Sequence, residues 1–208
     1  MLNRYFKLDP KNIDFLYANI SVKNIYFALI SLDYILNRPF KDYGIYHNEH
    51  TYYFFHLQSL LTACGNICNV FYNMSRSKKK KVTERCKRLC KEFNICKCDF
   101  PLIFQKEARN TNEHFDERYE QYNGQLGDYN IIGNETDSFI RIAIETNPHL
   151  RTYYKETGIY ITSNRKLERI EYNLYDLQKE LIEMLNRITK NPIFDSAWAD
   201  SMPGEELK

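Results

Sequence analysis

Apolar residues recur every three or four positions along much of this chain, which is the period of an amphipathic helix. One such stripe covers residues 21–37 and stops before Pro39, and a longer one covers 49–74. The basic segment 78–93 also keeps one apolar face. These patterns predict three helices in the first half of the chain.

Two further helices are expected in the second half. Residues 102–122 contain no Gly or Pro and are followed by Asn123-Gly124, a strong helix stop, and 165–190 carry a leucine-rich stripe. Between them, 127–163 changes to an alternating pattern typical of strands. The clearest alternating stretches are Phe139–Glu145 and Ile159–Thr162, with Thr157-Gly158 as a turn. The sequence therefore predicts a mainly α fold: a four- to five-helix bundle with a small antiparallel hairpin or sheet inserted before the last helix.

The chain has 208 residues, of which 43% are hydrophobic, enough for one domain with a sizeable core. We expect that domain to span residues 1–190, with 191–208 as a loosely ordered tail. No stretch approaches the ~18 uncharged apolar residues that a membrane span needs, and residues 1–10 lack the apolar core of a signal peptide. A cytoplasmic protein that does not associate with membranes is expected.

Six cysteines are expected to be reduced, since the chain is large and shows no export signal. They are Cys64, Cys68, Cys86, Cys90, Cys96 and Cys98. The pairs Cys64/Cys68 and Cys86/Cys90 each share a helix face and could hold zinc if those faces met. Both pairs fall on apolar stripes, so buried core residues are the favoured interpretation. No metal and no cofactor is predicted.

Positive charge is concentrated in one segment. The whole chain has a net charge of +2, yet residues 76–97 contain ten Lys or Arg against Glu84 and Glu92. A polyanion is a plausible partner for this excess of eight charges, and a solvated helix face is the alternative.

The segment 107–118 carries the candidate chemistry. Asn110 and His114 are four residues apart and share a helix face, whereas Arg109 lies about 140° from His114 around the axis at 100° per residue. A long guanidinium can bridge much of that angle, or serve a second subunit packed on the same face. The structural alternative is a surface ion pair between Arg109 and Glu113.

Arg109-Asn110-(x)3-His114, on the penultimate long helix of the expected bundle, resembles the R-(polar)-(x)3–5-H motif of the HEPN superfamily. The resemblance covers the helices from 49 to 190 in order, and about ten residues carry it. It implies a homodimer in which two motif helices meet across a twofold axis and place two Arg/His sets around one cleft. Many members are metal-independent endoribonucleases of toxin, abortive-infection or other defence systems. Where some toxins carry Tyr two residues after the His, this chain has Asp116, which puts control by modification of that tyrosine in doubt.

The resemblance assigns roles to individual residues. Arg109 would stabilise the phosphate, His114 would act as general acid and base, and Asn110 would orient either group. Supporting positions are Glu113, Asp116 and Arg118. The excess of positive charge, rather than the resemblance, suggests the candidate RNA contacts, which are Lys78, Lys79, Lys80, Lys81, Arg85 and Arg88. The expected products are a 2′,3′-cyclic phosphate and a 5′-hydroxyl.

Two other functions fit the same sequence. A catalytically silent HEPN-like module would bind a partner protein or a nucleotide. A nucleic-acid-binding protein would act through the basic segment alone, and its binding would fall steeply with salt. The RNA target, the biological trigger and any antitoxin or defence-system partner are left open.

Overall fold

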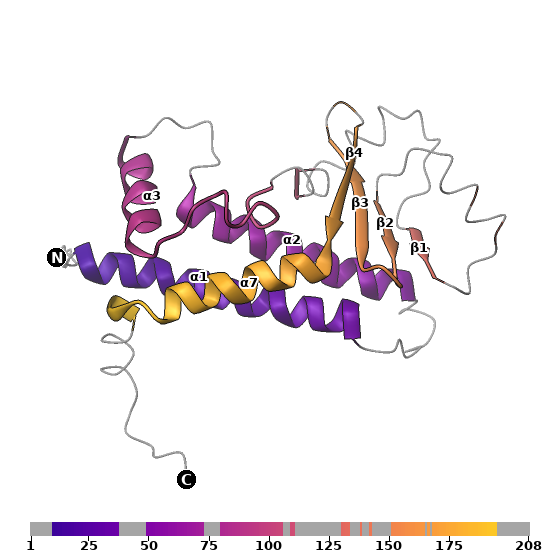
Figure 1. The fold of residues 1–208 in the computed structure, drawn as a ribbon, viewed down its shortest axis with the longest axis horizontal. Helices are drawn as coiled ribbons and strands as arrows, with labels where there is room; N and C mark the ends of the chain where they lie inside the picture. The colour runs from indigo at the N-terminus through magenta and orange to yellow at the C-terminus, as the bar shows by residue number, and fades with distance from the viewer. Residues whose placement is uncertain are drawn as a thin grey trace, which may run out of the picture.

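The computed structural model describes residues 10–37, 49–72, 80–105, 109–110, 130–133, 138, 142, 151–164, 166 and 168–194. Within these ranges the chain is mainly helical, with a small mixed sheet before the last long helix (Figure 1). The predicted fold class is confirmed at this level.

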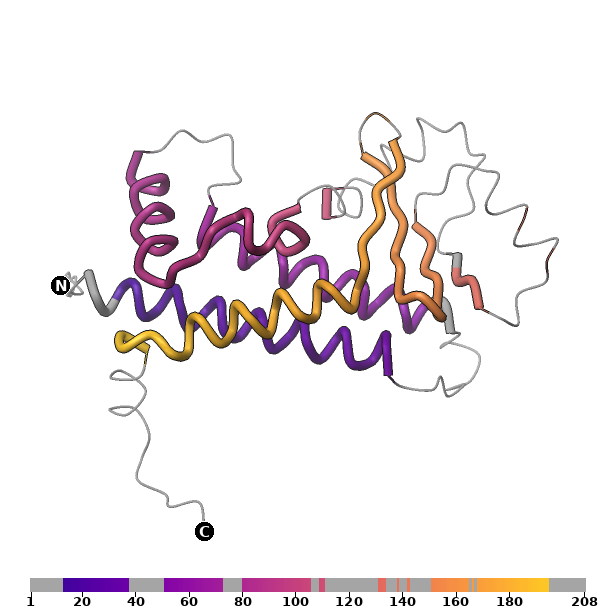
Figure 2. Tube along the Cα trace, viewed as in Figure 1, coloured from indigo at the N-terminus to yellow at the C-terminus, as the bar shows by residue number. Residues whose placement is uncertain are grey.

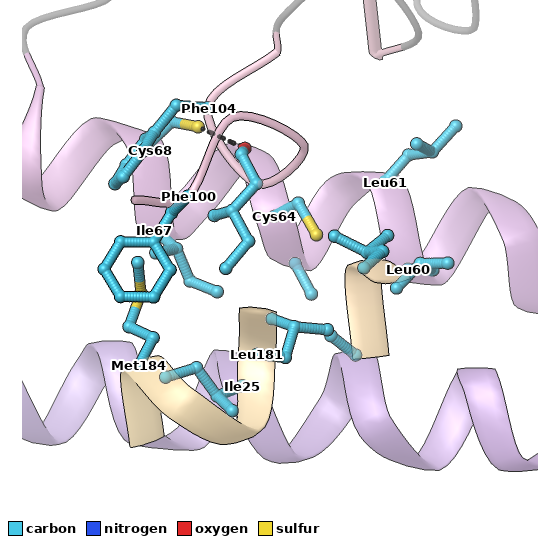
Figure 3. Packing of buried hydrophobic residues seen from close by; sticks show 14 of the residues in the cluster. Ile25, Leu60, Leu61, Cys64, Ile67, Cys68, Phe100, Phe104, Leu181 and Met184 are labelled. Atoms are coloured by element: carbon cyan, nitrogen blue, oxygen red, sulfur yellow. Dashed lines mark hydrogen bonds between the residues drawn. The ribbon is translucent and has the colours of Figure 1, made fainter. Parts of the chain in front are cut away.

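Three long helices form the body of the molecule and run along its long axis (Figure 1). They are α1 (Pro10–Asn37), α2 (Glu49–Phe71) and α7 (Leu174–Thr189). α1 runs antiparallel to both of the others (Figures 1 and 2). Ile25, Ile67 and Leu181, one from each helix, are fully buried where the three meet (Figure 3). Burying each such side chain stabilises the fold by about 1.5–3 kcal/mol.

α1 begins earlier than the sequence analysis expected. The predicted start was residue 21, but the helix begins at Pro10. Proline is favoured in the first turn of a helix, where its missing N–H costs nothing. Ala18 and Val22 then continue the buried stripe toward Ile25.

By length and composition, α1 could also cross a membrane over Ile13–Asn37, which the sequence analysis did not anticipate. Its inner positions Ala18, Ile25 and Leu32 are nevertheless fully buried in the protein core. A core helix and a signal sequence near the N-terminus pass the same composition test, and 39% of the apolar window in α1 is buried. We therefore describe α1 as a helix of the bundle.

The helix α3 (Lys80–Glu92) stands beside the N-terminal part of α1 (Figure 1). It buries Cys86 and Leu89 and turns most of its charged residues outward, as its amphipathic pattern predicts.

Four strands form one sheet in the order β1-β2-β3-β4. Their bounds are β1 (Asn130–Ile132), β2 (Arg151–Tyr154), β3 (Ile159–Ser163) and β4 (Arg169–Asn173). β2, β3 and β4 are antiparallel, with Tyr160 opposite Tyr172, whereas β1 pairs with β2 in parallel. The predicted strand at 159–162 and the turn before it are confirmed, and Gly158 has the positive φ of 64° that such a turn requires.

Several predicted boundaries are wrong. The sheet is mixed rather than antiparallel, and it extends to residue 173 rather than 163. The last helix therefore begins at Leu174 rather than 165, because 169–173 pairs with β3 and the Asn173 side chain accepts the N–H groups of Tyr175 and Asp176 as an N-cap.

Two further expectations fail within the described residues. Residues 101–104 form turns, so no continuous helix starts at 102. In the stretch 139–145, which was expected to be a strand, Ile142 is helical, as is Ser138 just before it. The other residues of 139–145 lie outside the described part. A short apolar run does not by its period alone distinguish a strand from a helix.

The packed body continues into the segment expected to be a tail. Phe194 is buried, and its ring lies 5.7 Å from that of Phe15, centre to centre. The Asn191 side chain accepts the N–H of Ile193 at 2.9 Å and fixes this final turn.

Candidate functional site

The side chain of Arg109 lies directly over Gly65 of α2. A Cβ added to Gly65 would lie 2.8 Å from both Nε and Nη1 of Arg109, closer than real Cβ contacts. The side chain that makes this close approach belongs to the first residue of the R-N-x3-H motif.

A turn anchored by α7 leads into this position. The Glu180 carboxylate accepts the N–H groups of Leu102 and Ile103, both at 3.0 Å through Oε2, and half-burial raises its pKa. The Tyr172 hydroxyl donates to the Gln105 carbonyl at 3.4 Å. The backbone four residues before Arg109 is therefore tied to β4 and α7.

The Arg109 charge acts on a buried thiol. Cys68 donates through Sγ to the Ile103 carbonyl at 3.0 Å (Figure 3). Burial raises the pKa of Cys68 to about 12, and the positive charge of Arg109 opposes part of that rise. Burial outweighs the charge of the guanidinium, so the Cys68 thiol stays protonated at neutral pH.

The space beside Arg109 is very small. A hollow of about 10 Å³ is lined by Gly65, Cys68, Gln105 and Arg109, among others. That volume holds one water at most. A substrate would have to meet the guanidinium from its outer side, since Arg109 is partly exposed.

Asn110 is helical and half-buried, next to Arg109. The other motif positions, Glu113, His114, Asp116 and Arg118, lie outside the described residues. The structure thus places the arginine and the amide side by side on a helical segment, and the geometry between Arg109 and His114 stays a prediction.

The predicted RNA-binding set divides into two groups. Lys80 and Lys81 are exposed at the start of α3, where Lys80 lies 4.0 Å from Glu84. Lys78 and Lys79 lie outside the described residues. Arg85 and Arg88 instead contact α1 and α2.

Arg88 forms a two-pronged ion pair with Asp14 of α1. Nε and Nη2 each donate to a carboxylate oxygen at 2.7 Å. The Asp14 side chain is 7% exposed and that of Arg88 is 47% exposed. The buried charge of Asp14 is therefore stabilised mainly by Arg88, whereas the charge of Arg88 is also stabilised by water.

Arg85 packs over the ring of Tyr17, 4.5 Å from its centre, and donates to the Tyr17 hydroxyl and to the Asn69 carbonyl. No sequence signal identified Asp14 or Tyr17 as partners, because they lie 74 and 68 residues away from the arginines.

The cysteines of α2 and α3 behave as core residues, as predicted. Cys68, Cys86 and Cys90 each donate to a backbone carbonyl, and the four thiols do not gather into a metal-binding group among the described residues. The expectation of six reduced thiols is wrong for one pair. Cys96 and Cys98 form a disulfide in an exposed turn, where their Cα atoms are 5.3 Å apart, a normal separation for this bond.

Burial predicts a clear order of thiol reactivity. The thiolate is the reactive form, and at pH 8 a pKa of about 12 leaves on the order of one Cys68 thiol in 10⁴ ionised. Native protein treated with reductant and then iodoacetamide should be modified at Cys96 and Cys98, with Cys64 and Cys68 modified only after addition of urea. Peptide mass spectrometry measures this, and equal labelling of Cys68 in native and denatured protein would contradict the described packing.

Comparison with known proteins gives no match: no protein-family model, no curated protein and no solved structure is detectably similar to this chain.

Proposed function

We propose that this chain is a HEPN-type, metal-independent endoribonuclease. The observation that carries the proposal is the position of the Arg109 side chain. Arg109 is the first residue of the Arg109-Asn110-(x)3-His114 motif, and its side chain lies over the one glycine in α2. A guanidinium held against a core helix is preorganised, which is what electrostatic stabilisation of a transition state requires.

The proposed chemistry needs no metal. His114 removes the proton from a ribose 2′-hydroxyl, and the 2′-oxygen attacks the adjacent phosphorus. The bond to the 5′-oxygen breaks, and that oxygen takes up a proton from the imidazolium. Arg109 binds the phosphate oxygens as charge builds on them, and Asn110 orients His114 or the phosphate.

The remaining assignments belong to the same proposal. Glu113, Asp116 and Arg118 would orient the reacting groups, and the exposed Lys80 and Lys81 would guide RNA toward them. The resemblance implies a cytoplasmic homodimer with a shared cleft and a toxin or phage-defence role, with an antitoxin or other defence protein as a further partner.

Cleavage of a mixed RNA in EDTA tests the proposal. Wild-type protein should cut and leave cyclic phosphates, while Arg109→Ala and His114→Ala should each lose about 10²–10⁴-fold in rate. Arg169→Ala removes an exposed arginine that is paired with Glu171, and serves as the matched control. Equal activity in all four proteins would show that the motif is not the active site.

A catalytically silent binding module is the second candidate, and two observations favour it. The hollow at Arg109 is too small for a substrate, and Arg85 and Arg88 are engaged within the chain. Inactivity of the wild-type protein on varied RNAs would favour this alternative. Binding of RNA that falls steeply with salt and is unchanged by His114→Ala would instead favour recognition by the basic segment alone.

A further inference from the structure

The outer faces of α1 and α2 form an open apolar groove. It has a volume of about 680 Å³. Its floor includes the buried Ser31 and Ala63, and its walls include Phe27, Ile30 and Phe55. Asn66 of α2 donates to Asn24 of α1 at 3.0 Å and links the two helices there.

The apolar surface continues beyond the groove along α1. Leu16, Ile20, Phe27 and Ile30 recur at helical spacing on the outer side of that helix. Six of the nine exposed large hydrophobic residues in the described part of the chain belong to α1 or α2. Isolated exposed apolar residues are ordinary, but a continuous patch marks an interaction site.

We propose that this groove face is a self-association interface, on which a second copy of the chain docks about a twofold axis. A twofold contact uses the same patch on both subunits, so the patch must contain both projecting and receiving parts. This one does. Phe27 and Phe55 project, with 60% and 63% of their surface exposed, beside a floor of small side chains.

The charges and the area also fit a second copy. The groove lining contains no Lys, Arg, Asp or Glu, so two copies meet without like-charge repulsion. Lys23 is the charged residue along the α1 stripe, and its long side chain can extend to the rim. The exposed aromatic and aliphatic groups offer on the order of 500 Å² per protomer, or about 1,000 Å² for two copies, which is the smallest total area expected of a specific interface.

This contact is separate from the proposed nuclease chemistry. Phe55, Ser59 and Thr62 share the groove face of α2, whereas Gly65 and Cys68 lie roughly 90–150° away around the helix axis. Docking through the groove would leave both Arg109 side chains accessible. A motif-helix contact could coexist with it in a closed tetramer.

Light scattering after size exclusion tests the inference on the full chain. Wild type should elute as a multiple of the 25.0 kDa chain mass, and Phe27→Glu with Phe55→Glu should halve the number of copies. Ile182→Glu, at a residue of α7 that is 46% exposed, is the matched control and should change nothing. An unchanged copy number in the double variant, or a monomeric wild type, would overturn the inference.

A second measurement leaves Phe27 and Phe55 in place and adds no charge to the groove. Thr62→Cys places a thiol in the groove, and mild oxidation should cross-link two chains through it, as seen on a non-reducing gel. A cross-link beyond that of wild type would support docking with Thr62 near the twofold axis, and its absence together with an unchanged copy number in the double variant would count against docking. Wild type that pellets with phosphatidylcholine vesicles through Phe27 and Phe55 while staying monomeric would assign the face to a membrane instead. RNA cleavage is measured separately, so failure here leaves the nuclease proposal standing.

Discussion

Replacement of Arg88 by alanine is expected to lower the free energy of unfolding by about 2–3 kcal/mol, because it leaves the Asp14 carboxylate buried without its partner. For a chain of this size that corresponds to a fall in Tm of roughly 5–10 °C. Thermal unfolding followed by circular dichroism gives the value.

Lys87 provides the matched control, since it lies on α3 beside Arg88 and is exposed. Lys87→Ala removes the same charge and should change stability by no more than about 0.5 kcal/mol. Adding Asp14→Asn to Arg88→Ala should recover part of the loss, because it removes the uncompensated charge. If Arg88→Ala were as stable as Lys87→Ala, the ion pair would not be holding α3 against α1.

The second large effect is expected at Gly65 and rests on the proposed function. A methyl group at this position would lie under 3 Å from the Arg109 side chain, which must then move by about an ångström. A displacement of that size at a catalytic group can cost about 10²-fold in rate. Gly65→Ala should therefore slow RNA cleavage strongly.

The same substitution should leave the fold intact. Alanine is favoured over glycine inside a helix by about 1 kcal/mol, and the atoms displaced belong to the far end of a flexible side chain. Tm should hold or rise while activity falls. Ser59→Ala, on the groove face of α2, is the control and should preserve cleavage. Full activity in Gly65→Ala, with cleavage still dependent on Arg109, would show that cleavage does not require the close contact between the Arg109 side chain and Gly65.

The long helices were predictable because they carry stripes of buried residues at helical spacing. The stripe of α2 was correctly extended from Glu49, and α3 was placed within two residues. The mixed sheet was not predictable. Ile170 fits both a helical stripe and an alternating strand, and only pairing with Thr162 decides between them. Local pattern carries no information about a partner strand.

The residue types of the candidate site could be predicted from the sequence, but the residues that surround Arg109 in the fold could not. The spacing of Arg109, Asn110 and His114 suggested a motif. Nothing in the sequence connected Arg109 with Gly65, since they are 44 positions apart in the numbering. The partners of the arginines in the basic segment could not be predicted for the same reason. Arg85 and Arg88 look like their lysine neighbours until Tyr17 and Asp14 are brought to them by the fold.

The contact between α1 and α7 has a consequence for synthesis in the cell. α1 packs against both α2 and α7, yet more than a hundred residues separate the end of α2 from the end of α7. At ribosomal rates of about 5–20 residues per second, α1 and α2 wait on the order of ten seconds for the helix that covers their inner face. Nascent chains would expose two apolar faces during that interval, when aggregation competes with folding.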